Sequence, residues 1–216
     1  IYQLARQSKF NPEQLESATD IMLIPDLIGF LLTGKKATER TNASTTGMLD
    51  ATTRSWSREI IERAGLTRAS SKFPELKSAG ETLGKVLPEF GDGLKNTNVV
   101  LVGSHDTASA VVGVPADSDE FAFISSGTWS LLGSEIPAPI LSEASRRANF
   151  TNELGVQNRV RYLKNLSGLW LLAECLREWK LETDLNALGN LLIEAASFDP
   201  DSLLDLADVN LISPGN

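Results

Sequence analysis

The stretch from residue 98 to residue 113, NVVLVGSHDTASAVVG, constrains the fold of this chain more than any other. Its apolar first part, residues 98–102, predicts a buried strand, and Gly103 predicts the turn that ends the strand. The small residues that follow, up to Gly113, predict a closely packed helix. In open α/β sheets, ligands bind at strand-to-helix turns of this kind.

The turn carries His105 and Asp106, and His105 is the sole histidine of the sequence. A carboxylate at the mouth of the turn can take a proton from an attacking hydroxyl, so Asp106 is a candidate general base. His105 is then a neighbouring hydrogen-bond donor. An aspartate that only caps the following helix would leave the same pattern. On residue types and spacing alone, both interpretations of Asp106 stay open.

Two other kinds of site place a histidine next to an aspartate. Metal-dependent hydrolases need several further histidines, and the sequence has none. A Ser–His–Asp triad needs a serine on a sharp strand-to-helix turn, and no G-x-S-x-G motif occurs near His105. A general base with a hydrogen-bonding neighbour is the chemistry that remains.

Two further segments carry polar residues suited to ligands. Residues 126–128 (SGT) separate the apolar segments 121–125 and 129–133 and predict a tight hairpin. Its backbone N–H groups and hydroxyls suit phosphate oxygens, although hairpins also use such residues for local reasons. Asn165 follows the alternating segment 159–163 at a predicted strand-to-helix junction. Its amide can bind a ligand hydroxyl there, or Asn165 is only a turn residue.

The first hundred residues predict mostly helices. Asn11 followed by Pro12 predicts a helix start, because proline favours the first helical position. The other predicted elements are a helix from Pro25 to a stop at Gly34, a loop at residues 41–47, a helix at residues 56–64, a helix capped by Ser167, and a helix at residues 185–196. In the helix after Ser167, we expect Trp170 and Trp179 in the core and Cys175 as a buried structural thiol.

Composition limits the partners of the chain. Its net charge of -8 argues against binding to nucleic acid and to anionic membranes. No apolar run approaches the roughly 20 residues needed to cross a bilayer. The single cysteine cannot form an internal disulfide, which fits a reducing cytoplasm. Because the sequence starts within a predicted helix and stops in a turn, we expect a fragment of a longer protein, whose uncovered apolar faces favour self-association.

Taken in order, several segments resemble the rhamnulokinase branch of the FGGY carbohydrate kinases, which belong to the actin and sugar-kinase superfamily. These segments are residues 103–110 (GSHDTASA), 125–131 (SSGTWSL), 149–153 (NFTNE) and 163–172 (LKNLSGLWLL), and the likeness extends to residues 25–26 and 41–46. The resemblance implies an α/β fold of the actin-like (ribonuclease H-like) ATPase kind, with parts of two domains joined at a catalytic cleft. It implies that residues 1–117 are the later part of a sugar-binding domain. Residues 118–216 are then the opening part of a nucleotide-binding domain.

The resemblance also implies roles for individual residues. In the family, the residue at the position of Asp106 is the catalytic base, which draws the proton from a sugar hydroxyl as its oxygen attacks the γ-phosphate of ATP. The other implied roles are sugar binding by His105, Thr107 and Asn165, and nucleotide binding by Gly127 and Thr128. Ala173 stands where relatives often have a glutamine that helps to hold the nucleotide. The resemblance implies no metal ligand within the chain.

The implied reaction is the transfer of the γ-phosphate of Mg-ATP to the 1-hydroxyl of L-rhamnulose. The alternatives are a kinase for another ketose, L-fuculose or L-xylulose, and a non-catalytic relative that binds sugar or nucleotide. The family's N-terminal phosphate-binding motif and its later adenosine-binding segment do not occur in this sequence. We therefore expect the isolated chain to be inactive.

Overall fold

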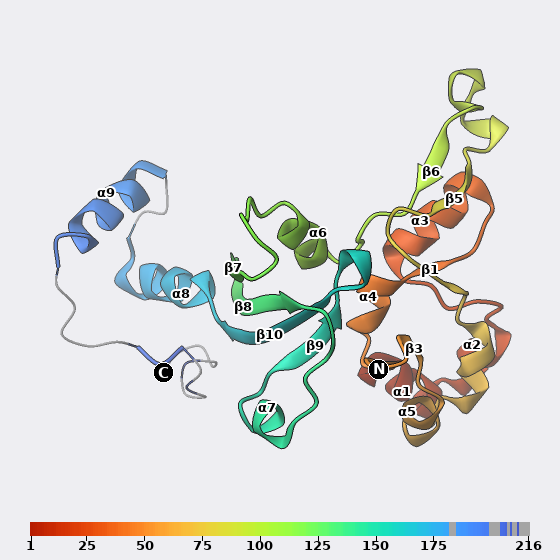
Figure 1. Ribbon diagram of the computed structural model, residues 1–216, viewed down its shortest axis with the longest axis horizontal. Coiled ribbons are helices and arrows are strands. Elements are labelled where there is room, and N and C mark those ends of the chain that lie inside the picture. The colour runs from red at the N-terminus through yellow and green to blue at the C-terminus, as the bar shows by residue number, and fades with distance from the viewer. Residues whose placement is uncertain (182–184, 199–203, 207, 209–210, 212–216) are drawn as a thin grey trace. The chain divides into compact units, whose positions relative to one another are not determined.

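The computed structural model describes residues 1–181, 185–198, 204–206, 208 and 211 (Figure 1). The helices are α1 Tyr2–Phe10, α2 Pro12–Ser17, α3 Ile24–Thr33, α4 Arg40–Ser44, α5 Arg58–Arg63, α6 Asp106–Val112, α7 Glu143–Arg147, α8 Leu169–Trp179 and α9 Leu185–Ala195. The strands are β1 Thr38–Glu39, β2 Leu49–Asp50, β3 Ser55–Trp56, β4 Leu76–Lys77, β5 Thr82–Lys85, β6 Asn98–Val100, β7 Ala122–Ser126, β8 Trp129–Ile136, β9 Thr151–Leu154 and β10 Val160–Ser167. Short 3₁₀ turns lie at Thr67–Lys72, Pro88–Phe90, Asp92–Leu94 and Val156–Asn158.

The chain divides into two compact units. The first unit holds residues 1–122 and 134–163, and the second holds residues 123–133 and 164–216. The boundary predicted between residues 117 and 118, with a sugar-binding part before it and a nucleotide-binding part after it, stays a prediction.

The strands form small sheets. β1 pairs with β4 in parallel, while β2 pairs with β3 and β5 with β6 in antiparallel fashion. A four-stranded sheet has the order β7-β8-β10-β9. Its β9–β10 pair is an antiparallel hairpin with Val160 opposite Leu154. Gln157 and Asn158 at its tip have φ angles of 55° and 61°, and this is the type I′ geometry that matches the twist of paired strands.

Several of the predicted helix signals are confirmed. α2 begins at Pro12 after Asn11, and α3 has Pro25 in its first turn. Gly34 ends α3 with a left-handed backbone at φ 68°. The predicted helix at residues 185–196 is also present, as α9.

The loop predicted at residues 41–47 is wrong, because α4 occupies most of it. The Glu39 side chain accepts the backbone N–H groups of Thr41 and Asn42 and so caps this helix. The helix predicted at residues 56–64 begins later than expected. Trp56 belongs to β3, and the Ser57 hydroxyl accepts the Ile60 N–H at the start of α5.

Several burial predictions are wrong. β6 was expected to be buried, but it pairs only with β5 among the described strands and leaves Val100 49% exposed. On α8, Trp179 is 60% exposed and Cys175 is an exposed free thiol. Ser167 does not cap α8, because β10 runs through it and Gly168 precedes the helix. The sequence pattern marks positions such as Val100 and Trp179 as apolar, but it does not show which of them a neighbouring element covers.

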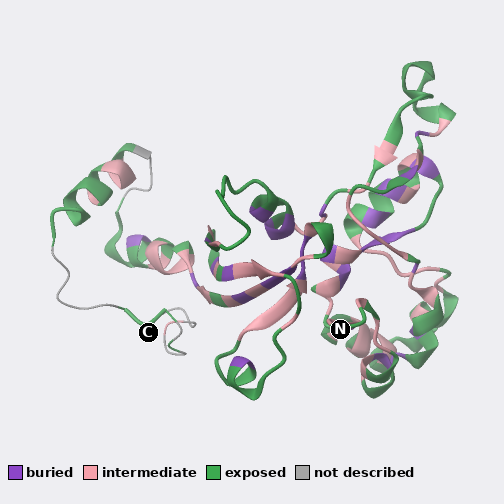
Figure 2. Cartoon of the chain, in the orientation of Figure 1, coloured by how far each residue is buried: buried purple, intermediate pink, exposed green. Residues whose placement is uncertain are grey.

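Apolar packing in the first unit includes a cluster of Met48, Ile61, Leu66 and Ala69. Trp56 and Phe73 pack against this cluster and stack on each other with their ring centres 4.8 Å apart. Buried residues also lie on α4, α6 and β10 (Figure 2). Over the described part of the chain, no helix is both long and apolar enough to cross a membrane.

Candidate functional site

The turn between β6 and α6 is tightly packed. A Cβ on Gly103 would lie 2.9 Å from a methyl carbon of Val156, so the chain has room only for glycine there. The Ser109 hydroxyl donates to the Gly103 carbonyl oxygen over 2.5 Å and holds the turn against α6. The strand-to-helix geometry predicted for this motif is therefore present, with β6 ending at Val100 and α6 beginning at Asp106.

Glu39 also holds the turn between β6 and α6 in place. Its side chain is buried, and its carboxylate accepts the backbone N–H and the hydroxyl of Ser104. The same carboxylate accepts the Thr41 N–H at 3.0 Å, and the Thr41 hydroxyl in turn accepts the His105 N–H at 3.4 Å. Nothing in the local sequence around Glu39 indicates that it also binds this turn, because Ser104 lies 65 positions away along the chain.

His105 lies between a buried cation and an exposed carboxylate. Its Nδ1 is 3.1 Å from a guanidinium nitrogen of Arg161, and its Nε2 is 3.7 Å from Oδ1 of Asp106. Burial lowers the pKa of His105, and the charge of Arg161 lowers it further. The imidazole is therefore neutral at pH 7.

The Asp106 side chain is 96% exposed, so a ligand can reach its carboxylate. Its Oδ1 accepts the backbone N–H of Thr107 at 2.6 Å and lies 3.3 Å from the Thr107 hydroxyl. Thr107 itself is buried. His105 occupies the cap position of α6 and Asp106 is its first residue. Asp106 is thus not the helix cap that its sequence pattern also allowed.

Gly127 and Thr128 form the predicted tight turn between β7 and β8 in the second unit, and both are exposed. The Gly127 N–H donates to the Trp129 carbonyl oxygen at 2.9 Å. The carbonyl oxygens of Gly127 and Thr128 accept the N–H groups of Leu169 and Trp170, at 2.9 and 3.2 Å. The turn therefore supplies the cap of α8 that was predicted for Ser167.

Asn165 is also exposed, but it does not lie at a strand-to-helix junction as predicted. β10 continues past it to Ser167, so Asn165 is a strand residue. Ala173 is exposed on α8. The structure thus brings His105, Asp106 and Thr107 together in the first unit, and it places Gly127, Thr128 and Asn165 in the second.

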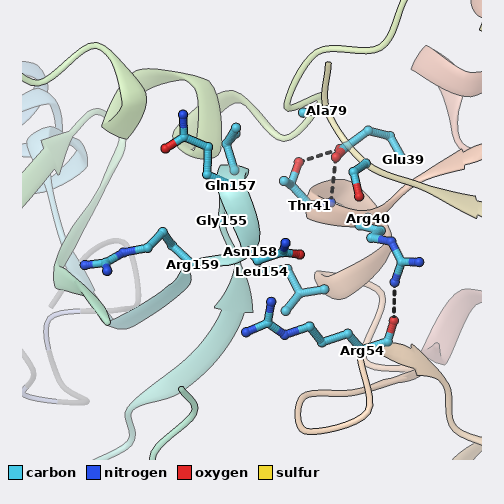
Figure 3. Close-up of a pocket in the computed structure, with 12 residues that line it drawn as sticks. Glu39, Arg40, Thr41, Arg54, Ala79, Leu154, Gly155, Gln157, Asn158 and Arg159 are labelled. Carbon is cyan, nitrogen blue, oxygen red and sulfur yellow. Dashed lines mark hydrogen bonds between the residues drawn. The ribbon is translucent and has the colours of Figure 1, made fainter. Parts of the chain in front are cut away.

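A small cavity lies beside the Glu39 network, between α4 and the β9–β10 hairpin (Figure 3). Its lining includes Arg40, whose guanidinium donates to the Arg54 carbonyl oxygen at 2.7 Å. The volume of about 20 Å³ holds roughly one water molecule and is too small for a sugar. Among the described residues, no group of three or more His, Cys, Asp or Glu side chains is placed to hold a metal ion.

Known proteins resemble this chain over its whole length. It is 38% identical to a rhamnulokinase of Enterococcus faecalis. This alignment covers 100% of this chain and 43% of that protein. It is also 40% identical to a rhamnulokinase of Halalkalibacterium halodurans. This second alignment covers 100% of this chain and 45% of that protein. The chain thus spans less than half the length of the curated relatives it matches.

Solved structures share the fold. A gluconate kinase from Lactobacillus acidophilus superposes with a TM-score of 0.73 and 18% identity, over 90% of this chain and 39% of that chain. The model of the N-terminal domain of the FGGY family of carbohydrate kinases matches residues 8–113, and the model of the C-terminal domain matches residues 122–216. The chain therefore belongs to the FGGY family of carbohydrate kinases and has their actin-like fold.

Proposed function

We propose that the protein is an ATP-dependent sugar kinase that phosphorylates the 1-hydroxyl of L-rhamnulose, giving L-rhamnulose 1-phosphate and ADP. The observation that carries the proposal is the exposed Asp106 carboxylate beside a neutral His105 at the start of α6. The choice of sugar is supported by the relatives named rhamnulokinase at 38% and 40% identity.

In this reaction, the sugar oxygen forms a bond to the γ-phosphorus while the bond from that phosphorus to the β–γ bridging oxygen breaks. Asp106 takes the proton that the hydroxyl loses, and ADP leaves. Phosphoryl transfer depends mainly on alignment and on stabilisation of charge, and one carboxylate that orients or deprotonates the nucleophile is a recurring part. The high exposure of Asp106 suits this role, because the carboxylate must meet a substrate that comes from solvent.

The neighbours of Asp106 divide into residues that hold it and residues that meet ligands. Thr107 is buried and donates its N–H to the carboxylate. We therefore assign Thr107 to orienting the base, and its contact with the sugar is less direct than that of His105. We assign His105 and Asn165 to sugar hydroxyls. Gly127 and Thr128 are assigned to the phosphates of Mg-ATP, which carries its divalent metal as part of the substrate.

Other parts of the proposal concern the whole protein. We assign residues 1–117 to a sugar-binding domain and residues 118–216 to a nucleotide-binding domain. A single cysteine and a net charge of -8 support a cytoplasmic enzyme with small-molecule partners. Exposed apolar side chains on α3, such as Ile28 and Leu31, support self-association of the isolated chain.

The test is ADP release by the complete protein that contains this chain, with Mg-ATP and a panel of L-rhamnulose, L-fuculose and L-xylulose. The proposal predicts the highest kcat/KM with L-rhamnulose. A preference for another ketose would keep the mechanism and reassign the substrate. Failure to turn over any of these sugars would favour a non-catalytic relative that binds sugar or nucleotide.

A further inference from the structure

Arg161 is a fully buried cation behind the candidate base. It lies on β10 with 0% of its side chain exposed. Its guanidinium forms an ion pair with Glu153 at 3.1 Å and donates from two nitrogens to the Leu154 carbonyl oxygen at 3.3 Å. A remaining nitrogen lies 3.1 Å from Nδ1 of His105. Arginine side chains are rarely fully buried unless they are paired, and these partners supply the pairing that Arg161 needs.

The contact with His105 has only one chemical form. A guanidinium has N–H donors and no acceptor, so Nδ1 of His105 must supply the lone pair. In the neutral imidazole the proton then resides on Nε2. That nitrogen is the one 3.7 Å from Oδ1 of Asp106. The opposite tautomer would direct its N–H at a cation and a bare nitrogen lone pair at a carboxylate.

We propose that Arg161 is a positioning residue that holds His105 as its Nε2–H tautomer, so that the imidazole directs an N–H rather than a lone pair toward the side of Asp106 where the sugar would bind. The catalytic meaning of this arrangement rests on the proposed function. The tautomer itself does not, because it follows from the contacts of Arg161.

The charges around His105 agree with a neutral ring. Burial and Arg161 lower the pKa of His105, while Glu153, Asp106 and Glu39 raise it. The lowering effects prevail. The imidazole can therefore donate its one N–H without adding a positive charge next to the carboxylate. This division of roles leaves Asp106 as the proton acceptor and His105 as a donor that does not change its protonation during turnover.

The experiment uses the fact that His105 is the single histidine. Long-range ¹H–¹⁵N correlation spectra of the full chain labelled with ¹⁵N-histidine contain one imidazole, and the couplings to its two carbon-bound protons identify each nitrogen. At pH 7, we expect a protonated Nε2 and a bare Nδ1, with a ring pKa below 6.5. A ring that is charged at pH 7, or that carries its proton on Nδ1, would overturn the proposal.

Two variants extend the test. In Arg161→Met combined with Glu153→Gln, both members of the buried ion pair are neutral, and we expect a mixture of tautomers and a higher ring pKa. In Arg161→Lys, a cationic donor remains, and we expect Nε2–H to be retained. An unchanged tautomer in the double variant would contradict the role of Arg161. Because these spectra need no substrate, a correct tautomer in the chain together with no sugar phosphorylation by the complete protein would reject the proposed function alone. An active kinase with the proton on Nδ1 would reject the Arg161 inference alone.

Discussion

The Glu39 carboxylate accepts both the backbone N–H and the side-chain hydroxyl of Ser104, over 3.0 and 3.1 Å. The two residues are 65 positions apart along the sequence. Glu39 also caps α4, so one buried carboxylate joins this helix to the turn that carries His105 and Asp106. The placement of the candidate base thus depends on a side chain outside the motif.

Glu39→Gln tests this dependence. An amide nitrogen in place of one carboxylate oxygen cannot accept the bonds from Ser104 and Asn42 that Oε2 accepts. Leaving buried donors unpaired costs about 1–3 kcal/mol, and these donors are partly buried, so we expect the free energy of unfolding in urea to fall by up to that amount. Ser104→Ala removes only the hydroxyl donor and should cost about 1 kcal/mol.

The matched control is Glu59→Gln on α5, where Glu59 pairs with Arg63 at the surface. Exposed pairs of this spacing contribute only about 0.3–0.5 kcal/mol. If Glu39→Gln destabilised the chain no more than Glu59→Gln, the Glu39 network would not hold the turn.

Asp26 gives a pH dependence with a definite sign. Burial raises its pKa from 3.8 to about 6, although the Glu39 N–H that it accepts opposes the rise. The folded state thus holds this proton more tightly than the unfolded state. The resulting stabilisation is complete below about pH 4 and is lost as the pH rises through about 6.

Asp26→Asn removes this titration. As the pH rises from about 4 to about 7, we expect the unfolding free energy of the variant to increase relative to that of the wild type by up to about 3 kcal/mol. This figure is the pKa shift converted at about 1.4 kcal/mol per pKa unit. Urea unfolding over this pH range measures the gain. Asp50→Asn is the control, because N–H donors from Thr53 and Thr52 lower the pKa of Asp50 from its ordinary value of 3.8, so its difference from the wild type should stay constant over this pH range. A constant difference between Asp26→Asn and wild type would contradict the buried titration.

Gly168 allows the hairpin that contains Gly127 and Thr128 to approach α8. A Cβ at Gly168 would lie 2.6 Å from the Gly127 carbonyl oxygen and 2.7 Å from the Ser130 nitrogen. Because these are backbone atoms, Gly168→Ala must displace the turn, at a cost of about 1–3 kcal/mol. In the complete protein, we expect KM for ATP to rise as well.

Gly93→Ala is the control for this change, because a Cβ at Gly93 meets no atom within 4 Å. Its effect on unfolding should stay within about 0.5 kcal/mol. Equal unfolding midpoints for the two variants would show that the close approach at Gly168 carries no constraint.

The sequence was sufficient for features that depend on neighbouring residues. Pro12, Pro25 and Gly34 predict helix ends because proline and glycine restrict or free the local backbone. The strand-to-helix turn before Asp106 and the tight turn at Gly127 follow from short local patterns in the same way. The family resemblance added the actin-like fold, which local patterns do not define.

Other features depend on contacts between distant residues, and the sequence pattern missed them. The alternating segment before Asn165 does not reveal that Arg161 is fully buried, because its burial depends on Glu153, Leu154 and His105. Trp179 was predicted to be in the core from its spacing on α8, yet it is exposed. Spacing shows which side of a helix is apolar, but only the fold shows what covers that side.

The most direct test of the proposed mechanism is the turnover of Asp106→Asn in the complete protein with Mg-ATP and L-rhamnulose. Loss of a general base typically costs 10²–10⁴-fold, so we expect kcat to fall by about two to four orders of magnitude while the affinity for the sugar stays nearly constant. Asp117→Asn, a change at an exposed carboxylate in the same unit, should leave kcat unchanged. Near-normal turnover of Asp106→Asn would contradict the account and remove this carboxylate from the mechanism.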